Sequence, residues 1–185
     1  MPQDLFTLSW RFWLFWALAF LGFPIGGWLA NVIVGPVTTT VMAGIAGAIA
    51  GAVLGVIQWF VLKGQIPVPF WWVIATSAGM AVGLAISVAF LGSETSGNVL
   101  LWRAAITGVS TGVAQWTLLR QKSPQTWIWI IVVTLGWVAG WFITRGAGID
   151  LDLKWPVFGA TGALAFQVLT GIAIYLIFRS TPGIK

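Results

Sequence analysis

The sequence predicts an all-α integral membrane protein with six transmembrane helices, arranged as three tandem, parallel-related helical hairpins. The first observation is composition: 59% of the 185 residues are hydrophobic and only 7% are charged, whereas a soluble domain carries about 25% charged residues. The second is a series of long apolar runs separated by short breaks. The third is an internal repeat that relates alternate runs to one another.

The apolar runs have the length of membrane-spanning helices, because a hydrocarbon core requires roughly 20 apolar residues in a helix. We expect the six spans at residues 10–33, 39–62, 70–91, 99–119, 126–144 and 156–178. Each break contains glycine, proline or charge, as is typical of turns at a membrane surface. The runs are continuously apolar and do not alternate, which favours helices over a membrane β-barrel. The first run is too long for a signal-peptide core and is expected to be retained.

The cations predict the orientation. With six spans, both termini and the loops after even spans share one side, which carries six cations: Arg11, Lys63, Arg120, Lys122, Arg179 and Lys185. The other side carries three cations and three carboxylates: Arg103, Arg145, Lys154, Glu94, Asp150 and Asp152. The positive-inside rule therefore predicts that both termini are cytoplasmic.

The repeat is clearest in the second and fourth spans, where GVIQWFVLK at 55–63 matches GVAQWTLLR at 112–120. The odd spans each carry a GxxxG pair, at 22/26, 79/83 and 136/140. In the last span the pattern drifts, and Ile174 replaces the repeated glutamine. We expect one transmembrane domain, 1–185, made of hairpin repeats at roughly 8–63, 67–122 and 124–180 and related by an axis along the membrane normal.

The glycines fall on helix faces together with glutamines. Small residues at helical spacing predict close packing between helices in a membrane. Gln58, Gln115 and Gln167 lie on these faces and should contact protein rather than lipid, because a carboxamide in a bilayer needs donors and acceptors. Two interpretations remain open: hydrogen bonds between helices, or contacts to a ligand or a pore.

The pattern GxxxGxxQWxxL[KR], followed by a tryptophan-rich span with GxxxG, resembles a loose group of small multi-pass bacterial membrane proteins that are frequent in cyanobacteria. The resemblance covers most of the chain. It implies a bacterial inner (plasma) membrane or a thylakoid membrane. Because that group has no established activity, the resemblance carries over no catalytic residue.

Enzymatic chemistry is not expected. The chain contains no histidine and no cysteine, which removes the commonest general base and the commonest soft metal ligands. The carboxylates lie outside the predicted spans. Apart from Arg11 at the start of the first span, the charge that intrudes on a span is Arg103, about one turn into the fourth. We expect Arg103 either to reach the membrane interface, beside Glu94, Asp150 or Asp152, or to bind an anionic headgroup or substrate. The scattered cations also argue against nucleic acid as a partner.

Fourteen tryptophans mostly lie near the ends of the predicted spans, as in the aromatic belts of membrane proteins. Trp16, Trp72 and Trp129 are assigned to this belt together with Trp59 and Trp116. The alternative role is stacking on a flat or polyene ligand such as a pigment or a quinone. The sequence requires no cofactor, although a pigment or a lipid would be compatible with it.

Two functions follow. The first is a non-catalytic accessory or scaffold protein, or one that binds a lipid or pigment, in a photosynthetic membrane. Its partners would be a larger membrane complex or further copies of the same chain. The second is a small neutral-solute transporter or channel lined by Gln58, Gln115 and Gln167. The candidate ligand or pore residues also include Arg103, Trp59 and Trp116.

Overall fold

The computed structural model describes residues 8–94, 97–146 and 160–179. These residues form helices and no strand, which confirms the all-α prediction. The helices are α1 (Trp10–Leu18), η1 (Ala19–Leu21), α2 (Gly22–Val34), α3 (Thr40–Leu62), α4 (Trp71–Leu91), α5 (Val99–Leu119), η2 (Pro124–Trp127), α6 (Ile128–Gly146) and α7 (Ala160–Phe178). They match the six predicted runs closely. The remaining residues, which include Asp150 and Asp152, lie outside the described part of the chain.

The first run is a bent rod made of α1, η1 and α2. Its bend has a local cause, because Pro24 in the first turn of α2 has no N–H to donate to the carbonyl of Phe20. The 3₁₀ turn of η1 lies immediately before this gap in the hydrogen-bond ladder. The bend directs α2 along α3, whereas α1 packs against α7.

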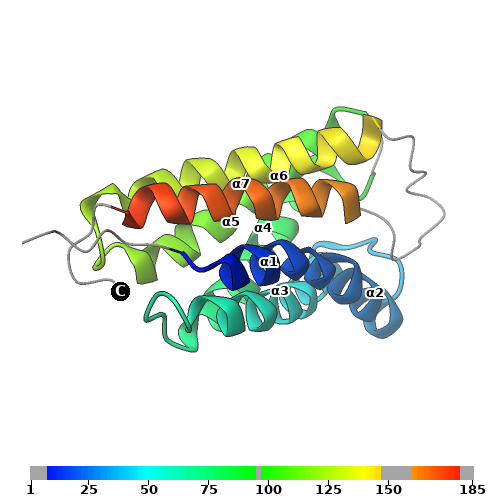
Figure 1. Cartoon of the computed structure of the whole chain (residues 1–185). Coiled ribbons are helices and arrows are strands. Elements are labelled where there is room, and N and C mark those ends of the chain that lie inside the picture. Colours follow the sequence, from blue (N-terminus) through cyan, green and yellow to red (C-terminus); the bar gives the residue numbers. More distant parts are fainter. Residues whose placement is uncertain (1–7, 95–96, 147–159, 180–185) are drawn as a thin grey trace, which may run out of the picture.

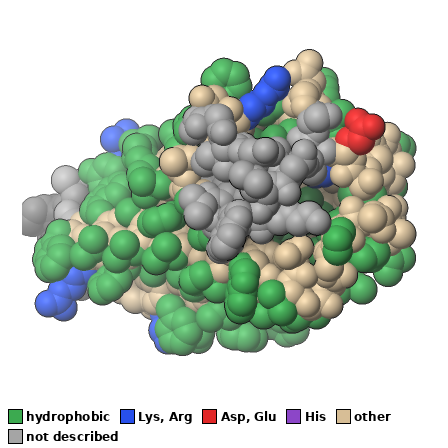
Figure 2. All heavy atoms as spheres, turned by 90° about the vertical axis from the view of Figure 1, so that its right-hand side faces the viewer, with side chains coloured by type: hydrophobic (Ala, Val, Ile, Leu, Met, Phe, Trp, Pro, Cys, Tyr) green, Lys and Arg blue, Asp and Glu red, His purple; other side chains and the backbone are tan. Residues whose placement is uncertain are grey.

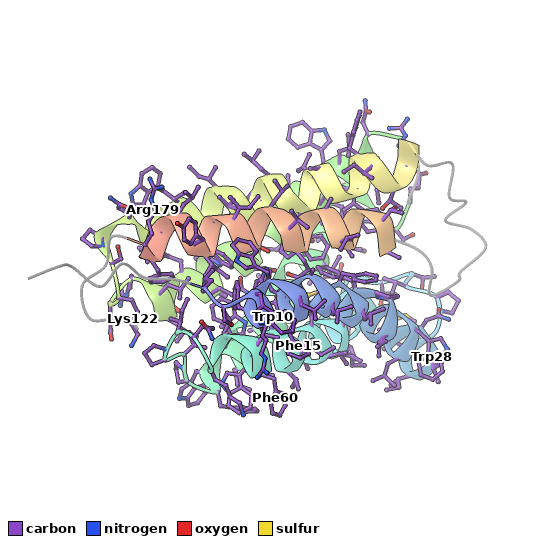
Figure 3. All side chains as sticks on the ribbon, in the orientation of Figure 1. Trp10, Phe15, Trp28, Phe60, Lys122 and Arg179 are labelled. Carbon is purple, nitrogen blue, oxygen red and sulfur yellow. The ribbon has the colours of Figure 1, made fainter. Side chains whose placement is uncertain are left out.

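The helices form one bundle in which each span packs on the next in sequence, from α2 through α7. Contacts of α1 and η1 with α7 bring the first and last spans together. The long helices run roughly side by side (Figure 1), and the C-terminal ends of α2, α4 and α6 lie at one end of the bundle. Lys122 and Arg179 lie at the opposite end (Figure 3).

Five of the six rods are long and apolar enough to cross a membrane: Trp10–Val34, Thr40–Leu62, Trp71–Leu91, Pro124–Gly146 and Ala160–Phe178. This is the pattern of a multi-pass membrane protein. The sixth rod, α5, has 21 residues, as α4 does, but is more polar because it carries Arg103 and several threonines. It packs between α4 and α6.

The outside of the bundle is apolar. Phe15, Trp28 and Phe60 are 54%, 52% and 57% exposed, and Trp28 and Phe60 lie at the outer edge of the bundle (Figure 3). Seen from the end at which α2, α4 and α6 finish, hydrophobic side chains cover the flanks, with Lys and Arg at the margins (Figure 2). A surface of this kind fits lipid rather than water.

The repeated glycines lie where helix backbones come closest. A Cβ added to Gly79 would lie 2.6 Å from the Cα of Thr111, and one added to Gly83 would lie 2.6 Å from the Cα of Thr107. A Cβ at Gly108 would lie 2.7 Å from the Cα of Thr134. These positions join α4 to α5 and α5 to α6, as expected of glycines that allow close packing between helices.

The aromatic-belt prediction is wrong for three tryptophans. Trp16, Trp72 and Trp129 are each only 1% exposed and belong to the hydrophobic core. Closeness to a helix end does not determine the face on which a residue lies, and these three face the inside of the bundle. By contrast, Trp10, Trp71, Trp102 and Trp127 are more than half exposed, as belt residues should be.

Candidate functional site

A cavity of about 170 Å³ lies inside the bundle and takes lining residues from all six rods. We call it the central cavity. Phe23 and Gly27 come from α2, Ala50 from α3, Met80 and Leu84 from α4, Arg103, Ala104 and Thr107 from α5, Gly136, Trp137, Gly140, Trp141 and Thr144 from α6, and Gly162, Ala163 and Phe166 from α7. Its lining is mostly apolar, with a small number of polar side chains, which is the usual composition of a small-molecule site.

One part of the lining is aromatic. The rings of Phe23 and Trp137 have centroids 5.3 Å apart, and those of Phe23 and Phe166 lie 5.4 Å apart, both edge to face. Trp137 and Phe166 complete the set at 6.0 Å. We call Phe23, Trp137 and Phe166 the aromatic trio. Their mutual contacts fix the three rings, so the trio offers a rigid apolar surface to anything in the cavity.

Another part of the lining is polar and unsatisfied. Four of the lining residues carry a buried polar atom that has no hydrogen-bond partner among the described residues: Arg103 Nε, Thr107 Oγ1, Trp137 Nε1 and Thr144 Oγ1. Thr107 and Thr144 are each 1% exposed. Native proteins rarely leave buried polar atoms unpaired, because each such atom costs about 1–3 kcal/mol. Four of the six such atoms found among the described residues belong to residues that line this cavity.

Arg103 lies about one turn from the start of α5. Its guanidinium donates two hydrogen bonds of 2.8 Å, to the backbone carbonyls of Gly92 and Glu94. These bonds hold the side chain against the turn between α4 and α5. Within the described residues Arg103 has no carboxylate partner, so the expected pairing with the Glu94 side chain is not seen and that with Asp150 or Asp152 lies outside the description.

The central cavity reaches the side of the bundle at α2. Gly27 is an exposed residue and also lines the cavity. A Cβ placed on Gly27 would meet no atom within 4 Å, whereas one on the preceding Gly26 would lie 2.9 Å from the Ala50 carbonyl oxygen. The bend after η1 takes α2 toward α3 and away from extensive contact with α7. The cavity is therefore open beside Gly27.

The repeated glutamines lie in a separate, hydrogen-bonded part of the core. Gln115 is 2% exposed. Its carbonyl oxygen accepts a 2.9 Å bond from the indole of Trp129, and its amide donates a 2.9 Å bond to Thr76 Oγ1. Because Trp129 is on α6 and Thr76 is on α4, one glutamine on α5 joins three helices.

Gln58 repeats this arrangement with a different partner. Its carbonyl oxygen accepts a 3.3 Å bond from Trp72 Nε1, and its amide donates to Gln167 Oε1 at 3.4 Å. On α7, Thr170 Oγ1 accepts a 3.2 Å bond from Trp16 Nε1 of α1. Gln167 is fully buried, and its Nε2 has no partner among the described residues.

These side chains form what we call the glutamine–tryptophan layer: Gln58, Gln115, Gln167, Trp16, Trp72 and Trp129. The layer and the polar part of the cavity lie at different heights. On α5, Gln115 and Arg103 are about 18 Å apart along the helix axis. None of the three glutamines lines the central cavity. Two of the predicted ligand or pore residues thus join helices through both ends of their carboxamides, and only Arg103 of the predicted set lines the cavity.

Trp59 and Trp116 lie at the end of the bundle that carries the repeated cations. Lys63 Nζ lies 4.4 Å from the ring centroid of Trp59 and 4.3 Å from that of Phe60. Arg120 lies 5.9 Å from the ring of Trp116. The repeated WxxL[KR] therefore places a cation one helical turn after a tryptophan, over its ring. The structure does not bring these two tryptophans to the cavity.

A second hollow of about 350 Å³ runs between α6 and α7 and is lined almost entirely by aliphatic side chains, among them Val132, Leu169 and Leu176. Leu169 and Leu176 are exposed on the outer surface of α7. The hollow carries no charged lining residue. It is a groove in the lipid-facing surface.

The sequence also carries a signal for the layer, in the spacing between the glutamines and the tryptophans. Trp72 follows Gln58 by 14 positions, and Trp129 follows Gln115 by the same 14 positions. A constant spacing between two residues that can hydrogen-bond, on consecutive helices, predicts that the glutamine and the tryptophan pair with each other. Thr76 had no such signal, because Val133 stands at its equivalent position in the next repeat.

The cavity thus combines an aromatic trio, unpaired donors and an opening beside α2, and it is separate from the layer that holds the helices together. Comparison with protein-family models, with curated protein sequences and with solved structures finds no match to the chain.

Proposed function

We propose that this chain is a non-catalytic multi-pass membrane protein that holds a small hydrophobic or amphipathic molecule in its central cavity. The observation that carries the proposal is the lining: all six rods contribute to one mostly apolar cavity, and four of its lining residues carry an unpaired polar atom. Largely apolar pockets with a few convergent polar groups are typical binding sites for small molecules and cofactors.

The size of the cavity restricts the ligand. Its volume of about 170 Å³ is close to that of the roughly 150 Å³ protein cavity that takes up a benzene ring. A complete chlorophyll or carotenoid is much larger than this. The volume therefore favours a lipid-like molecule, of which one part enters the cavity while the rest lies in the opening beside Gly27. A pigment would have to lie mostly outside the bundle.

The proposal includes the hairpin architecture and the topology. Each of Trp16, Trp72 and Trp129 lies on an odd span and donates to an even span, with Trp16 on the first span reaching the last. This cyclic relation supports three tandem hairpins around a pseudo-threefold axis along the membrane normal. The greater number of cations at the end with Lys63 and Arg120 supports cytoplasmic termini in a bacterial inner or thylakoid membrane.

The hydrogen bonding of the glutamines favours a ligand holder over a channel. A pore lining must present free polar groups to a solute, whereas the carboxamides of Gln58 and Gln115 are each bonded at both ends to neighbouring helices. Opening a path between them would break these bonds inside the membrane. The bonded layer is therefore better suited to closing the bundle below the cavity.

The experiment is the identification of small molecules that remain with the protein when it is purified gently, together with the native lipids around it. Mass spectrometry of the extract and a visible absorption spectrum would then be recorded. We expect a stoichiometric, colourless amphipathic molecule enriched over bulk lipid. A composition identical to that of bulk lipid would contradict the proposal, and a stoichiometric pigment would contradict the size argument.

A matched pair of variants links the molecule to the cavity. Gly27→Phe places a ring at the opening, where the backbone leaves room for a side chain. Gly146→Phe adds the same ring at the end of α6. A Cβ at Gly146 also meets nothing within 4 Å, and Gly146 does not line the cavity. Gly27→Phe should release the bound molecule and Gly146→Phe should retain it.

A further inference from the structure

We infer that the ligand of the central cavity is an anionic amphiphile, with a carboxylate or phosphate head at Arg103, Thr107 and Thr144 and an apolar tail against the aromatic trio. This inference rests on the proposed function and specifies the chemical class of the ligand. The structural basis is a juxtaposition: a cation and unpaired donors lie in the same small cavity as a cluster of aromatic rings.

The unpaired atoms define what the head must offer. Arg103 Nε and Trp137 Nε1 can only donate hydrogen bonds, because a guanidinium and an indole have no acceptor. The hydroxyls of Thr107 and Thr144 can donate as well as accept. A ligand that satisfies all four must therefore be rich in acceptor oxygens. Carboxylate and phosphate groups fit best, because their oxygens accept several bonds and leave none of their own donors unpaired.

The charge of Arg103 selects an anion rather than a neutral carbonyl. Its two hydrogen bonds go to backbone carbonyls, which are uncharged, and no described carboxylate pairs with it. A charged side chain within a membrane-spanning helix is costly, and such residues generally pair with an opposite charge or line a polar path. An anionic head at the cavity would supply the missing opposite charge in a medium where that interaction is strong.

The aromatic trio selects an apolar tail. Phe23 lies near the middle of the first rod, and Trp137 and Phe166 lie in the interior of α6 and α7, whereas Arg103 lies near the start of α5. A free inorganic anion would leave these rings facing an empty apolar volume. An amphiphile fills both parts, since its head meets the donors and its chain covers the rings. The exposed Gly27 gives the chain a route from the lipid.

The test measures binding to the whole protein in a neutral maltoside detergent. Four probes are compared: dodecanoate, dodecyl phosphate, dodecanol and inorganic phosphate. The first two share the tail and carry a charged head, dodecanol keeps the tail alone, and inorganic phosphate keeps the head alone. We expect at least one of the charged amphiphiles to bind roughly 10- to 100-fold more tightly than dodecanol, as loss of a charge-assisted bond implies. Inorganic phosphate should bind weakly and compete poorly.

Arg103→Gln removes the proposed partner of the anionic head, and Arg145→Gln is its control, because it removes the same charge outside the cavity. Arg145 lies at the same end of the bundle and also donates to a backbone carbonyl, that of Gly97, but it does not line the cavity. Arg103→Gln should remove the preference for the charged amphiphiles over dodecanol, and Arg145→Gln should leave it intact. An equal loss in both variants would overturn the inference, because it would show a diffuse effect of net charge.

A second variant guards against misfolding of Arg103→Gln, which also loses the bonds to Gly92 and Glu94. Thr144→Val removes an unpaired hydroxyl with little change in shape. It should raise the melting temperature of the empty protein, because an unsatisfied polar atom is lost, and should weaken binding of the charged amphiphiles severalfold. Unchanged binding in Thr144→Val and Arg103→Gln would overturn the assignment of the head.

The outcomes separate the inference from the proposed function. If dodecanol binds in the cavity as tightly as the charged amphiphiles, the anionic class is wrong while hydrophobic-ligand binding stands. If inorganic phosphate binds as tightly, the cavity is an anion site and the tail is not recognised. If no chain-bearing probe binds, or if Gly27→Phe does not affect their binding, the proposed function itself fails.

Discussion

Replacing Gly79 by alanine tests the close packing of α4 on α5, and the structure sets its magnitude. A Cβ on Gly79 would lie 2.6 Å from the Cα of Thr111, 3.0 Å from the Ser110 carbonyl oxygen and 3.1 Å from the Thr111 nitrogen. All three are backbone atoms, which cannot rotate away. The two helices would have to separate by a substantial part of an ångström before the contacts became ordinary.

Gly44→Ala is the matched control, because a Cβ there would lie 3.7 Å from the Ala85 Cβ, in normal contact. Both substitutions gain the same helix propensity, about 1 kcal/mol, so the difference between them isolates the packing cost. Overpacking of this kind costs about 1–3 kcal/mol. We therefore expect Gly79→Ala to be less stable than Gly44→Ala by about 1–3 kcal/mol.

The assay is reversible unfolding in mixed micelles of a mild detergent and sodium dodecyl sulfate, followed by circular dichroism. The free energy of unfolding of both variants is compared with that of the unsubstituted protein. Equal stabilities of the two variants, within about 0.5 kcal/mol, would refute the argument that the glycines exist to allow close backbone contact. A stability of Gly44→Ala below that of the parent would contradict the control.

Three further predictions concern the layer and the topology. In a double-mutant cycle, Gln115→Leu and Trp129→Phe should show a coupling of about 0.5–2 kcal/mol in unfolding free energy, and additive losses would mean that the 2.9 Å bond is not stabilising. The natural chain has no cysteine, so Ser93→Cys and Gln121→Cys can be labelled cleanly. In intact cells without an outer membrane, an impermeant maleimide should label Ser93→Cys alone, and the reverse pattern would place the termini outside. Finally, Gln58→Leu with Gln115→Leu should leave the flux of water and glycerol through proteoliposomes unchanged, whereas abolished flux would favour a channel.

The sequence predicted the helices well because the physical cause of each boundary is local. Apolar runs set the lengths of the spans. Thr39 accepts a hydrogen bond from the Met42 amide at the start of α3, and Gly92 ends α4 with a φ of +76°, which glycine adopts without strain. The repeat identified the glycine contacts for a similar reason, because residues at helical spacing share a face whatever the partner helix is.

The site was harder to predict, because it depends on how the helices are spaced and not only on their faces. Arg103 was identified as unusual by its charge, but Thr107, Thr144 and the aromatic trio become neighbours only once α5, α6, α7 and the bent first rod are packed together. Thr107 and Thr144 are ordinary residues in a membrane helix. What distinguishes them is that their hydroxyls have no hydrogen-bond partner among the described residues, and a sequence does not show this.

The same argument explains the three misassigned tryptophans. Trp72 and Trp129 are the second residues of α4 and α6, where belt residues are commonly found. Both nevertheless point into the bundle and donate a hydrogen bond to a glutamine. An indole N–H bonded inside the bundle contributes to helix association, whereas one at the interface is satisfied by water. Position along the helix could not distinguish these two cases, but the constant spacing to the glutamine could have.

The central claim is that an amphipathic molecule occupies the cavity, and an experimental density map of the protein in lipid discs, at a resolution that shows side chains, tests it most directly. We predict elongated density that begins within hydrogen-bond distance of Arg103, contacts the aromatic trio and leaves the bundle beside Gly27. A cavity filled by the protein's own side chains, or a column of water passing from it through the glutamine–tryptophan layer, would contradict the account.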